Sequence, residues 1–418
     1  MVRKVSRIQI WSACLGNLFE HYDSALFGFL SIFLAPMIFP MQDPLTGLIL
    51  TYAIIPLGML ARPLGALFFG YIGDLYGRNL ALFWSLAGMS ILSGFIAFTP
   101  TYSQVGVLAP IFFCFGRVLQ NFFSAGETIG GAVFLLENTP QKHQDLLSSI
   151  YSASTIGGIL VASFGVTYLS HFGMIEEGWR FLYLVGCLTG VFGCFIRSRM
   201  DVNAPSKTSI KMIGTFSHLT SVLWRFRKEI LLIAVVSGFS YASYSTALVL
   251  MNGFIPLVSS LTKAEIMRVN TGLLVLDFCA LPFFGWVASR VSREKMMLFA
   301  SLSIAICAIP LFLLLKEATL FMVILVRICF VLLGVVFCAP FHAWAQQLIP
   351  SAHRYLVIAF GYAIGSQVFG GPTSAIALWC FKQSGQVGSA SWYLVALAIG
   401  SSLAISFSLR SRFLLKNG

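Results

Sequence analysis

Charged residues are scarce in this sequence. Only 10% of its 418 residues are Asp, Glu, Lys or Arg, whereas 58% are hydrophobic, and the mean hydropathy is +0.86. About 25% of the residues of a soluble globular protein are charged, so this composition excludes that class and indicates a membrane protein. Because each transmembrane helix needs about 20 apolar residues, about twelve spans would use almost the whole chain. We therefore expect an all-α membrane protein with little room for a separate soluble domain.

The sequence also lacks the signals of several other protein classes. Its nine cysteines lie in hydrophobic segments and form no CxxC pair, so neither a disulfide framework nor a metal site is predicted. No GxxxxGKS/T loop is present, which argues against coupling to ATP hydrolysis within this chain. A receptor or a membrane-embedded enzyme would need a soluble module or a polar constellation at one interface, and we find neither. We expect no cofactor and no enzymatic activity.

Twelve apolar segments are long enough to span a bilayer. They are residues 8–35, 46–70, 79–98, 106–136, 148–170, 179–196, 230–256, 266–288, 296–315, 319–345, 355–380 and 392–409. The first of them is longer than a signal-peptide core and lacks a small-residue cleavage site, so we expect it to remain as a helix. The polar segment 197–229 predicts a cytoplasmic linker between two six-helix bundles, residues 1–196 and 230–418.

The net charge of +12 is explained by topology. Most basic residues fall at the two termini, in residues 197–229 and in the loops that follow even-numbered spans. The positive-inside rule places all of these in the cytoplasm. We therefore expect a multi-pass protein of the cell inner membrane with both termini cytoplasmic. Its partner is the lipid bilayer, and no nucleic acid is expected.

The two halves resemble each other. "FGYIGDLYGRN" at 69–79 corresponds to "FGWVASRVSRE" at 284–294, and Arg117 corresponds to Arg327. "HYDSAL" at 21–26 corresponds to "SYSTAL" at 243–248, so the acidic residues here are confined to the amino-terminal half. Two parallel six-helix repeats are typical of transporters whose substrate site lies at the membrane midplane between the halves.

These residues also resemble a known family. "GYIGDLYGRN" is similar to the loop signature of the major facilitator superfamily, G-x3-D-R/K-x-G-R/K-R/K. "ARPLGALFFGYIGD", "GRVLQNFFSAGE" and "RYLVIAFGYAIGSQVFGGP" resemble its metabolite:proton symporter branch, which includes proline/betaine, 2-oxoglutarate, citrate and shikimate carriers. The sequence departs from the pattern at Leu75 and Asn79 in the loop, at Asn121 and Ala125 in the fourth span, and at His21.

The resemblance implies a cytoplasmic latch. Its residues are Gly70, Asp74, Gly77, Arg78 and Glu137. In the family, the aspartate lies against a helix amino terminus and locks the halves in one state. We expect Glu137 to pair with Arg78, and Leu75, which replaces a basic residue, to loosen the latch.

Two carboxylates interrupt the first span. If Glu20 and Asp23 were both ionised at a helix centre they would cost about 5–7 kcal/mol, and the twelve Ile, Leu or Phe residues of this span would offset roughly 4–7 kcal/mol. The helix inserts comfortably only if a carboxylate is protonated, paired or facing water. Because Asn17, Glu20 and Ser24 share one stripe, we expect this stripe to face the central cavity. A packing role for either carboxylate remains the alternative, and His21 is expected to form a structural hydrogen bond.

The fourth span has a second polar stripe. Arg117, Gln120, Ser124 and Glu127 fall within an arc of about 80°. Arg117 and Glu127 are about 15 Å apart along the axis, so Arg117 is expected to pair with the first-span carboxylates instead. The resemblance associates an arginine at this position with proton coupling, and an arginine that moves would change how tightly a carboxylate holds its proton. We expect Asp23 and Glu127 to titrate, then Glu20, with Arg117 as their partner.

Other polar groups inside the spans are candidates for substrate binding. They are Asn17, Tyr22, Arg62, Gln120, Tyr241, Tyr244, Asp277, Arg327 and Tyr362. Arg117 and Arg327 favour a substrate with a carboxylate, while Arg62 is also near enough to the cytoplasm to snorkel. Packing is an equal alternative for the aromatic residues, including Trp344. Gly370-Gly371-Pro372 should break or kink the eleventh span, which suits a gate or close helix packing.

The sequence thus predicts a monomeric secondary transporter that works by alternating access. Inward proton flow would drive uptake of a small organic solute, with proline or betaine and a dicarboxylate such as 2-oxoglutarate as leading candidates. The alternative is an exchanger or a proton-independent facilitator of a small metabolite. In that case, neutralising Asp23 or Glu127 would not alter the response of uptake to a pH gradient.

Overall fold

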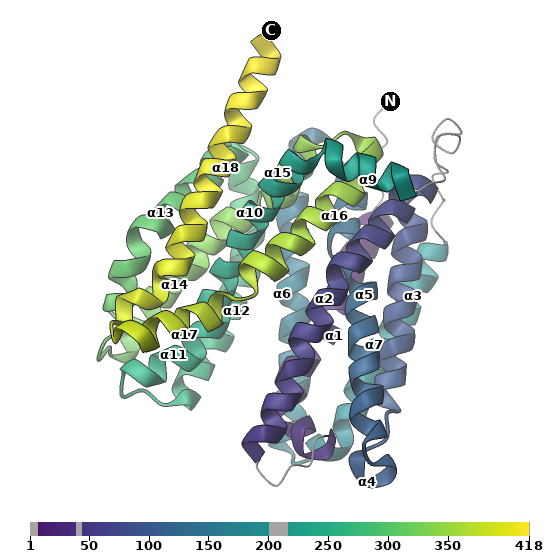
Figure 1. The fold of residues 1–418 in the computed structure, drawn as a ribbon, viewed down its shortest axis with the longest axis vertical. Helices are drawn as coiled ribbons and strands as arrows, with labels where there is room; N and C mark the ends of the chain where they lie inside the picture. The colour runs from purple at the N-terminus through teal and green to yellow at the C-terminus, as the bar shows by residue number, and fades with distance from the viewer. Residues whose placement is uncertain (1–6, 39–43, 200–215, 418) are drawn as a thin grey trace. The chain divides into compact units, whose positions relative to one another are not determined.

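All regular structure in the computed structural model, which describes residues 7–38, 44–199 and 216–417, is helical (Figure 1). Within these ranges nine helices are long and apolar enough to cross a membrane. The other three predicted spans coincide with the first two helices and with an interrupted helix over residues 354–384. The described chain is therefore an all-α membrane protein, as predicted.

Most helices of the amino-terminal half are long. They are α1 (Arg7–Ile38), α2 (Pro44–Tyr76), α3 (Arg78–Ala97), the single turn α4 (Tyr102–Val105), α5 (Leu108–Glu137), η1 (Gln141–His143), α6 (Gln144–His171) and α7 (Ile175–Ser198). A short helix, α9 (Phe216–Arg225), lies within the segment that the sequence predicted as a linker.

The carboxy-terminal half is more often interrupted. Its helices are α10 (Arg227–Ser245), η2 (Thr246–Leu250), α11 (Met251–Val258), α12 (Lys263–Ala288), α13 (Arg293–Leu313), α14 (Leu320–Cys338), α15 (Phe341–Leu348), η3 (Ser351–His353), α16 (Arg354–Ile364), η4 (Gly365–Gly370), α17 (Thr373–Ser384), η5 (Val387–Ser391) and α18 (Trp392–Asn417). The predicted break in the eleventh span is confirmed, because a π-helix ends at Gly370 and α17 begins after Pro372. Proline has no N–H to continue a helix, which explains the position of the break.

The described residues form two compact units. Unit 1 contains those of Met1–Asn138, Ser154–Val222 and Ser351–Phe360, and unit 2 contains those of Thr139–Ala153, Leu223–Pro350 and Gly361–Gly418. Three helices are divided between the units, and one of them is α9, whose residues 223–225 belong to unit 2. Residues 144–153 of α6 belong to unit 2, and residues 354–360 of α16 belong to unit 1.

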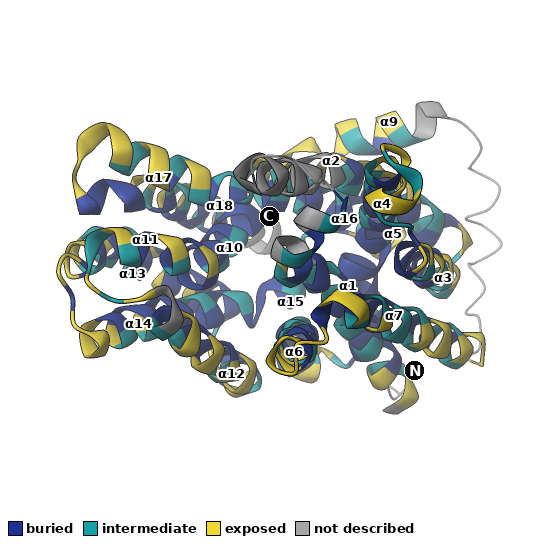
Figure 2. Cartoon of the chain, turned by 90° about the horizontal axis from the view of Figure 1, so that it is seen from below, coloured by how far each residue is buried: buried dark blue, intermediate teal, exposed yellow. Residues whose placement is uncertain are grey.

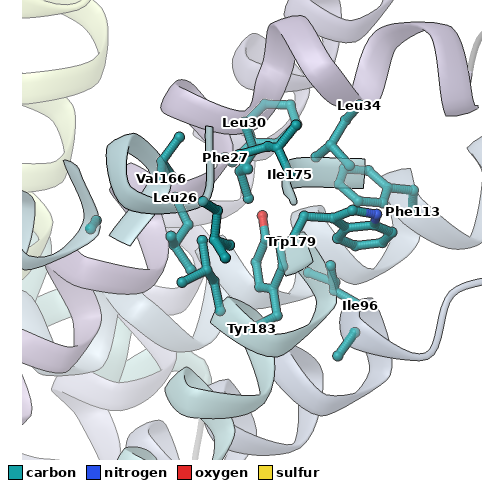
Figure 3. Packing of buried hydrophobic residues seen from close by; sticks show 14 of the residues in the cluster. Leu26, Phe27, Leu30, Leu34, Ile96, Phe113, Val166, Ile175, Trp179 and Tyr183 are labelled. Carbon is teal, nitrogen blue, oxygen red and sulfur yellow. The ribbon is translucent and has the colours of Figure 1, made fainter. Parts of the chain in front are cut away.

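The core of unit 1 is aromatic and aliphatic. Phe27 of α1 and Phe113 of α5 have ring centroids 5.7 Å apart, and Trp179 and Tyr183 of α7 lie in the same cluster (Figure 3). Many large apolar residues are exposed. Exposed positions lie along the outer faces of individual helices (Figure 2). Since an aqueous surface of this kind would be costly, these faces suit contact with lipid.

Small residues bring the helices of unit 1 close together. A Cβ atom at Gly158 of α6 would lie 2.2 Å from the carbonyl oxygen of Leu18 in α1, and one at Gly65 of α2 would lie 2.0 Å from that of Phe122 in α5. Only glycine fits at either crossing. Close crossings of this kind are typical of membrane helices, and these two fix the helices that carry the polar residues described below.

Candidate functional site

Glu20 is the centre of a buried charge cluster on α1. It is 0% exposed, and its Oε1 atom lies 3.1 Å from Nη2 of Arg62 on α2, while its Oε2 atom lies 2.7 Å from Nδ1 of His21. Asn121 of α5 accepts a hydrogen bond of 3.1 Å from Nε of Arg62. Arg62 thus faces a carboxylate of its own chain, held there by one of the residues that depart from the family pattern.

Asp23 is connected to Arg117 through neutral side chains. The Ser93 hydroxyl of α3 donates to Oδ2 of Asp23 at 2.7 Å, and Gln120 of α5 donates to Ser93 at 3.0 Å. Arg117 in turn donates to Oε1 of Gln120 at 2.5 Å, and its guanidinium lies over the Phe27 ring. We name Asp23, Ser93, Gln120 and Arg117 the relay.

The relay differs from the expected ion pair. In the described part of the chain, the Arg117 side chain contacts Gln120 and Phe27, and no salt bridge joins it to Asp23. Sequence reasoning missed Ser93 because a serine in an apolar span gives no periodic signal, and its role depends on which helix packs against it.

Glu127 forms a fully buried pair with Arg197. The guanidinium of Arg197 donates to both carboxylate oxygens of Glu127, at 2.6 and 2.7 Å, and to the carbonyl oxygen of Leu82 at 2.8 Å. The two side chains are 1% and 0% exposed. The sequence placed Arg197 in the linker, but α7 continues to Ser198 and turns Arg197 inward.

Two predicted substrate-binding residues join helices of unit 1. The amide of Asn17 donates to Ser154 and Thr155 of α6, at 2.8 and 2.9 Å. The hydroxyl of Tyr22, which is 4% exposed, donates to the carbonyl oxygen of Leu182 in α7 at 2.9 Å. In this conformation both side chains hold α1 against its neighbours.

Asp74 lies at the amino terminus of α16. Its carboxylate accepts hydrogen bonds from the backbone N–H groups of Tyr355 and Leu356, at 3.1 and 2.9 Å. These are among the groups that a helix leaves without internal partners, and the helix dipole favours a negative charge there. The predicted position of Asp74 against a helix amino terminus is confirmed, while its latching role remains a prediction.

Ion pairs surround Asp74. Arg78 pairs with Asp74 and also with Glu137, whose Oε2 atom is 3.1 Å from Nε of Arg78, so the predicted Arg78–Glu137 pair is confirmed. Arg354, from the first turn of α16, lies 3.0 Å from the other oxygen of Glu137. All of these residues belong to unit 1.

Gly70 and Gly77 of the latch must be glycine for two different reasons. A Cβ atom at Gly70 would lie 2.6 Å from Cα of Leu356, so the close approach of α16 requires glycine. Gly77, between α2 and α3, has a φ of 107°, which other residues rarely adopt. The loop signature thus describes a crossing, a turn and an anchored carboxylate.

Arg327 of α14 is held entirely by its own unit. It is 0% exposed and donates to the carbonyl oxygens of Ala247 and Ile266. It also donates to the side-chain oxygens of Asn252 and Asn270, at 2.9 and 2.5 Å. Binding of a substrate carboxylate by Arg327 would require these bonds to be released, so in this conformation Arg327 joins helices.

Asp277 and three tyrosines complete the predicted set. Asp277 of α12 is 6% exposed, and Tyr244 lies near the end of α10. Tyr362 of α16 packs against Phe341 with ring centroids 5.9 Å apart, and Tyr241 packs beside Gly370. Throughout the described ranges, His, Cys, Asp and Glu form no group of three or more that could hold a metal ion.

Comparison with known proteins gives consistent similarities. A family model described as Major Facilitator Superfamily matches residues 24–371. The putative proline/betaine transporter of Staphylococcus haemolyticus (strain JCSC1435) is 26% identical over 411 residues, covering 93% of this chain and 85% of that protein. The proline/betaine transporter of Salmonella typhimurium is 24% identical over 418 residues, with coverages of 94% and 81%.

Solved structures with the same fold are also found. The proton:xylose symporter XylE aligns with a TM-score of 0.73 and 14% sequence identity, covering 95% of this chain and 94% of that one. The Escherichia coli fucose:proton symporter FucP aligns with a TM-score of 0.70 and 14% identity, with coverages of 96% and 98%. At these identities the structural similarity establishes the fold alone.

Proposed function

Because the chain belongs to the major facilitator superfamily, whose members are membrane transporters, we propose that it is a proton-coupled symporter for a small organic solute. The relatives named proline/betaine transporters support a zwitterion such as proline or betaine as the substrate, and a carboxylate such as 2-oxoglutarate is the other candidate. The observation that carries the proton-coupling proposal is the relay of Asp23, Ser93, Gln120 and Arg117.

Asp23 is suited to bind and release a proton. It is 3% exposed, and burial favours the neutral form of a carboxyl group, whereas the nearby positive charge of Arg117 favours the ionised form. Since Ser93 can donate to a carboxylate or accept from a carboxylic acid, the relay accommodates either form. A small movement of Arg117 during transport would therefore change the proton affinity of Asp23.

The other two proposed coupling carboxylates have direct cationic partners. Glu20 faces Arg62, and Glu127 is held by both nitrogens of Arg197. Breaking a buried pair to protonate one member leaves an uncompensated charge, which is strongly unfavourable. Asp23 is therefore the leading coupling group, and Glu20 and Glu127 are secondary.

The latch and the topology belong to the same proposal. Release of Asp74 from α16 would free the first turns of that helix from unit 1, which suits a change between inward-open and outward-open states. We place the protein in the cell inner membrane as a monomer, with cytoplasmic termini and a cytoplasmic segment between α7 and α10 that separates two six-helix bundles.

Uptake into proteoliposomes tests this proposal. The purified full-length protein is reconstituted, and labelled proline, betaine or 2-oxoglutarate is supplied with an acidic exterior, with equal pH, and with a protonophore. We expect accumulation above the external concentration under the gradient alone. Uptake that reaches only equilibrium in all three conditions would indicate a facilitator, and uptake that requires internal solute would indicate an exchanger.

A further inference from the structure

Tyr355, in the first turn of α16, has one of the largest fully buried side chains in the described chain. Its hydroxyl donates a hydrogen bond to the carbonyl oxygen of Gly126 in α5. Both residues belong to unit 1, although they are far apart in the sequence. Because a buried tyrosine hydroxyl needs a partner, this bond explains how the whole side chain can be enclosed.

Two glycines make room for the Tyr355 ring. A Cβ atom at Gly73 of α2 would overlap the Cδ1 and Cε1 atoms of the ring, and one at Gly130 of α5 would overlap its hydroxyl oxygen and Cζ atom. The guanidinium of Arg78 lies over the ring, 5.7 Å from its centroid. We name the space between Gly73, Gly126 and Gly130 the tyrosine slot. A larger residue at Gly73 or Gly130 would push the ring out of it.

The polar contacts of the same turn are weaker in kind. Arg354 pairs with Glu137, and these side chains are 19% and 20% exposed. Asp74 accepts from the backbone N–H groups of Tyr355 and Leu356 at the helix end. Partly exposed ion pairs and charges at helix ends contribute little, whereas a fully buried ring contributes through its whole apolar area. Burial of the Tyr355 ring is therefore the strongest interaction expected to hold this turn in unit 1.

The other repeat has a different residue at the same place. Asp145, in the first turn of α6, corresponds to Tyr355 with the separation that also relates Arg117 to Arg327. It pairs with Arg293 of unit 2 at 2.5 Å. An ion pair thus holds the start of α6 in unit 2, whereas an aromatic ring holds the start of α16 in unit 1.

We propose that Tyr355 is a positioning residue: its insertion into the tyrosine slot holds the start of α16 in unit 1 and stabilises one state of the transport cycle. Departure of the ring empties the slot and releases the first turns of α16. The latch then depends on an aromatic side chain more than on charge, which compensates for Leu75 at a basic position of the loop signature. This inference rests on the proposed function, because it takes the held and released states to be those of alternating access.

Amide hydrogen exchange in the purified full-length protein tests whether Tyr355 holds the turn. Tyr355→Ala should reduce the protection of the peptide covering residues 351–360 about tenfold, more than Asp74→Asn does. Tyr355→Phe should have a smaller effect, because it loses only the bond to Gly126. Added 4-methylphenol, which has the shape of the missing side chain, should restore part of the protection in Tyr355→Ala. Tyr183→Ala, which removes another fully buried tyrosine of unit 1, is the control and should leave this peptide protected.

A second variant expels the ring without altering it. Gly130→Ala places a Cβ atom where the Tyr355 hydroxyl lies, so it should reproduce the loss of protection seen in Tyr355→Ala. Adding Tyr355→Ala to Gly130→Ala should cause little further loss, because both changes remove the same contact. Gly28→Ala is the matched control, since a Cβ atom there would meet no other part of the described chain within 4 Å.

Transport kinetics separate a role in the cycle from a role in stability alone. Exchange of labelled for unlabelled solute at equal pH is measured in membrane vesicles of each orientation. Because Tyr355→Ala should favour the released state, the half-saturating solute concentrations on the two sides of the membrane should shift in opposite directions, by about threefold or more. A change in stability alone would lower the amount of active protein and leave both concentrations unchanged.

Three results would overturn the inference. They are full protection of residues 351–360 in Tyr355→Ala, full protection in Gly130→Ala, and half-saturating concentrations that stay the same on both sides. If Tyr355→Ala does not fold, Tyr355→Phe and Gly130→Ala still decide. Hydrogen exchange needs no solute, and solute exchange at equal pH needs no proton gradient. Failure of proton coupling in the uptake assay is therefore distinguishable from failure of this inference.

Discussion

The two units differ in how they place charged residues near the middle of their helices. In unit 1 each of three carboxylates near the middle of a helix is opposed by an arginine, directly for Glu20 and Glu127 and through the relay for Asp23. Unit 2 also has a buried pair, Asp145 and Arg293, near helix ends. Near the middle of its helices, however, Asp277 and Arg327 form no ion pair with each other among the described residues. This difference is the reason that the proposed proton-coupling residues are placed in unit 1.

The two repeat-related arginines illustrate the difference. Arg117 is held by one side-chain hydrogen bond to a residue of its own helix and by a phenylalanine ring. Arg327 donates to two carbonyls and two amides from three other helical segments. The repeat-related arginines therefore have different numbers of partners, and we predict that Arg117 changes partners at a smaller cost than Arg327 does.

The largest expected effect comes from breaking the fully buried pair of unit 1. Glu127→Gln leaves Arg197 buried without a counter-charge and should lower the free energy of unfolding by about 3–5 kcal/mol. Denaturant unfolding in detergent micelles measures it. The double variant Glu127→Gln with Arg197→Gln should lose less than the sum of the single losses. A loss of less than about 1 kcal/mol in the free energy of unfolding of Glu127→Gln is typical of surface ion pairs and would contradict the expectation for a buried pair.

A smaller effect is expected from the amide partners of the two arginines. Asn270→Ala removes an acceptor from Arg327 and should lower the free energy of unfolding by about 1–3 kcal/mol, with transport per folded molecule retained. Gln120→Ala interrupts the relay. It should impair proton-coupled accumulation and leave the free energy of unfolding nearly unchanged. Unfolding and uptake are both measured for each of the two variants. The same outcome for both variants would remove the distinction between the two arginines.

The smallest effect is expected at the latch. Asp74→Asn loses the charge that stabilises the amino terminus of α16, at about 0.3–1 kcal/mol. Amide hydrogen exchange in the peptide covering residues 351–360 should accelerate several-fold. Ser289→Ala, at the corresponding position of the other repeat, is the control and should leave that peptide unchanged. Unchanged exchange in Asp74→Asn would show that the carboxylate does not hold the helix.

The features predicted from the sequence depend on local chemistry. The loop signature identified Gly70, Asp74 and Gly77, and the Arg78–Glu137 pair was predicted from charged residues that lie at neighbouring cytoplasmic ends of spans. Proline chemistry likewise located the break before α17. Apolar composition alone gave the all-α class and the membrane location.

The features that the sequence did not predict are contacts between side chains on different helices. Ser93 and Arg197 complete the Asp23 and Glu127 sites, yet neither position shares a motif with the residue it contacts. The repeat aligned Arg293 with Arg78, but its partner is Asp145 in the first turn of α6, at 2.5 Å. Periodicity states which face of a helix is polar. It does not state which helix lies opposite, and that depends on glycine crossings such as those at Gly65 and Gly158.

Transport by Asp23→Asn tests the central claim most directly. In proteoliposomes, two rates are measured for the natural protein and this variant: gradient-driven accumulation, and exchange of labelled for unlabelled solute at equal pH. If Asp23 carries the proton, the variant should lose gradient-driven accumulation and retain exchange, because solute binding and alternating access remain. Full gradient-driven accumulation by Asp23→Asn would contradict it.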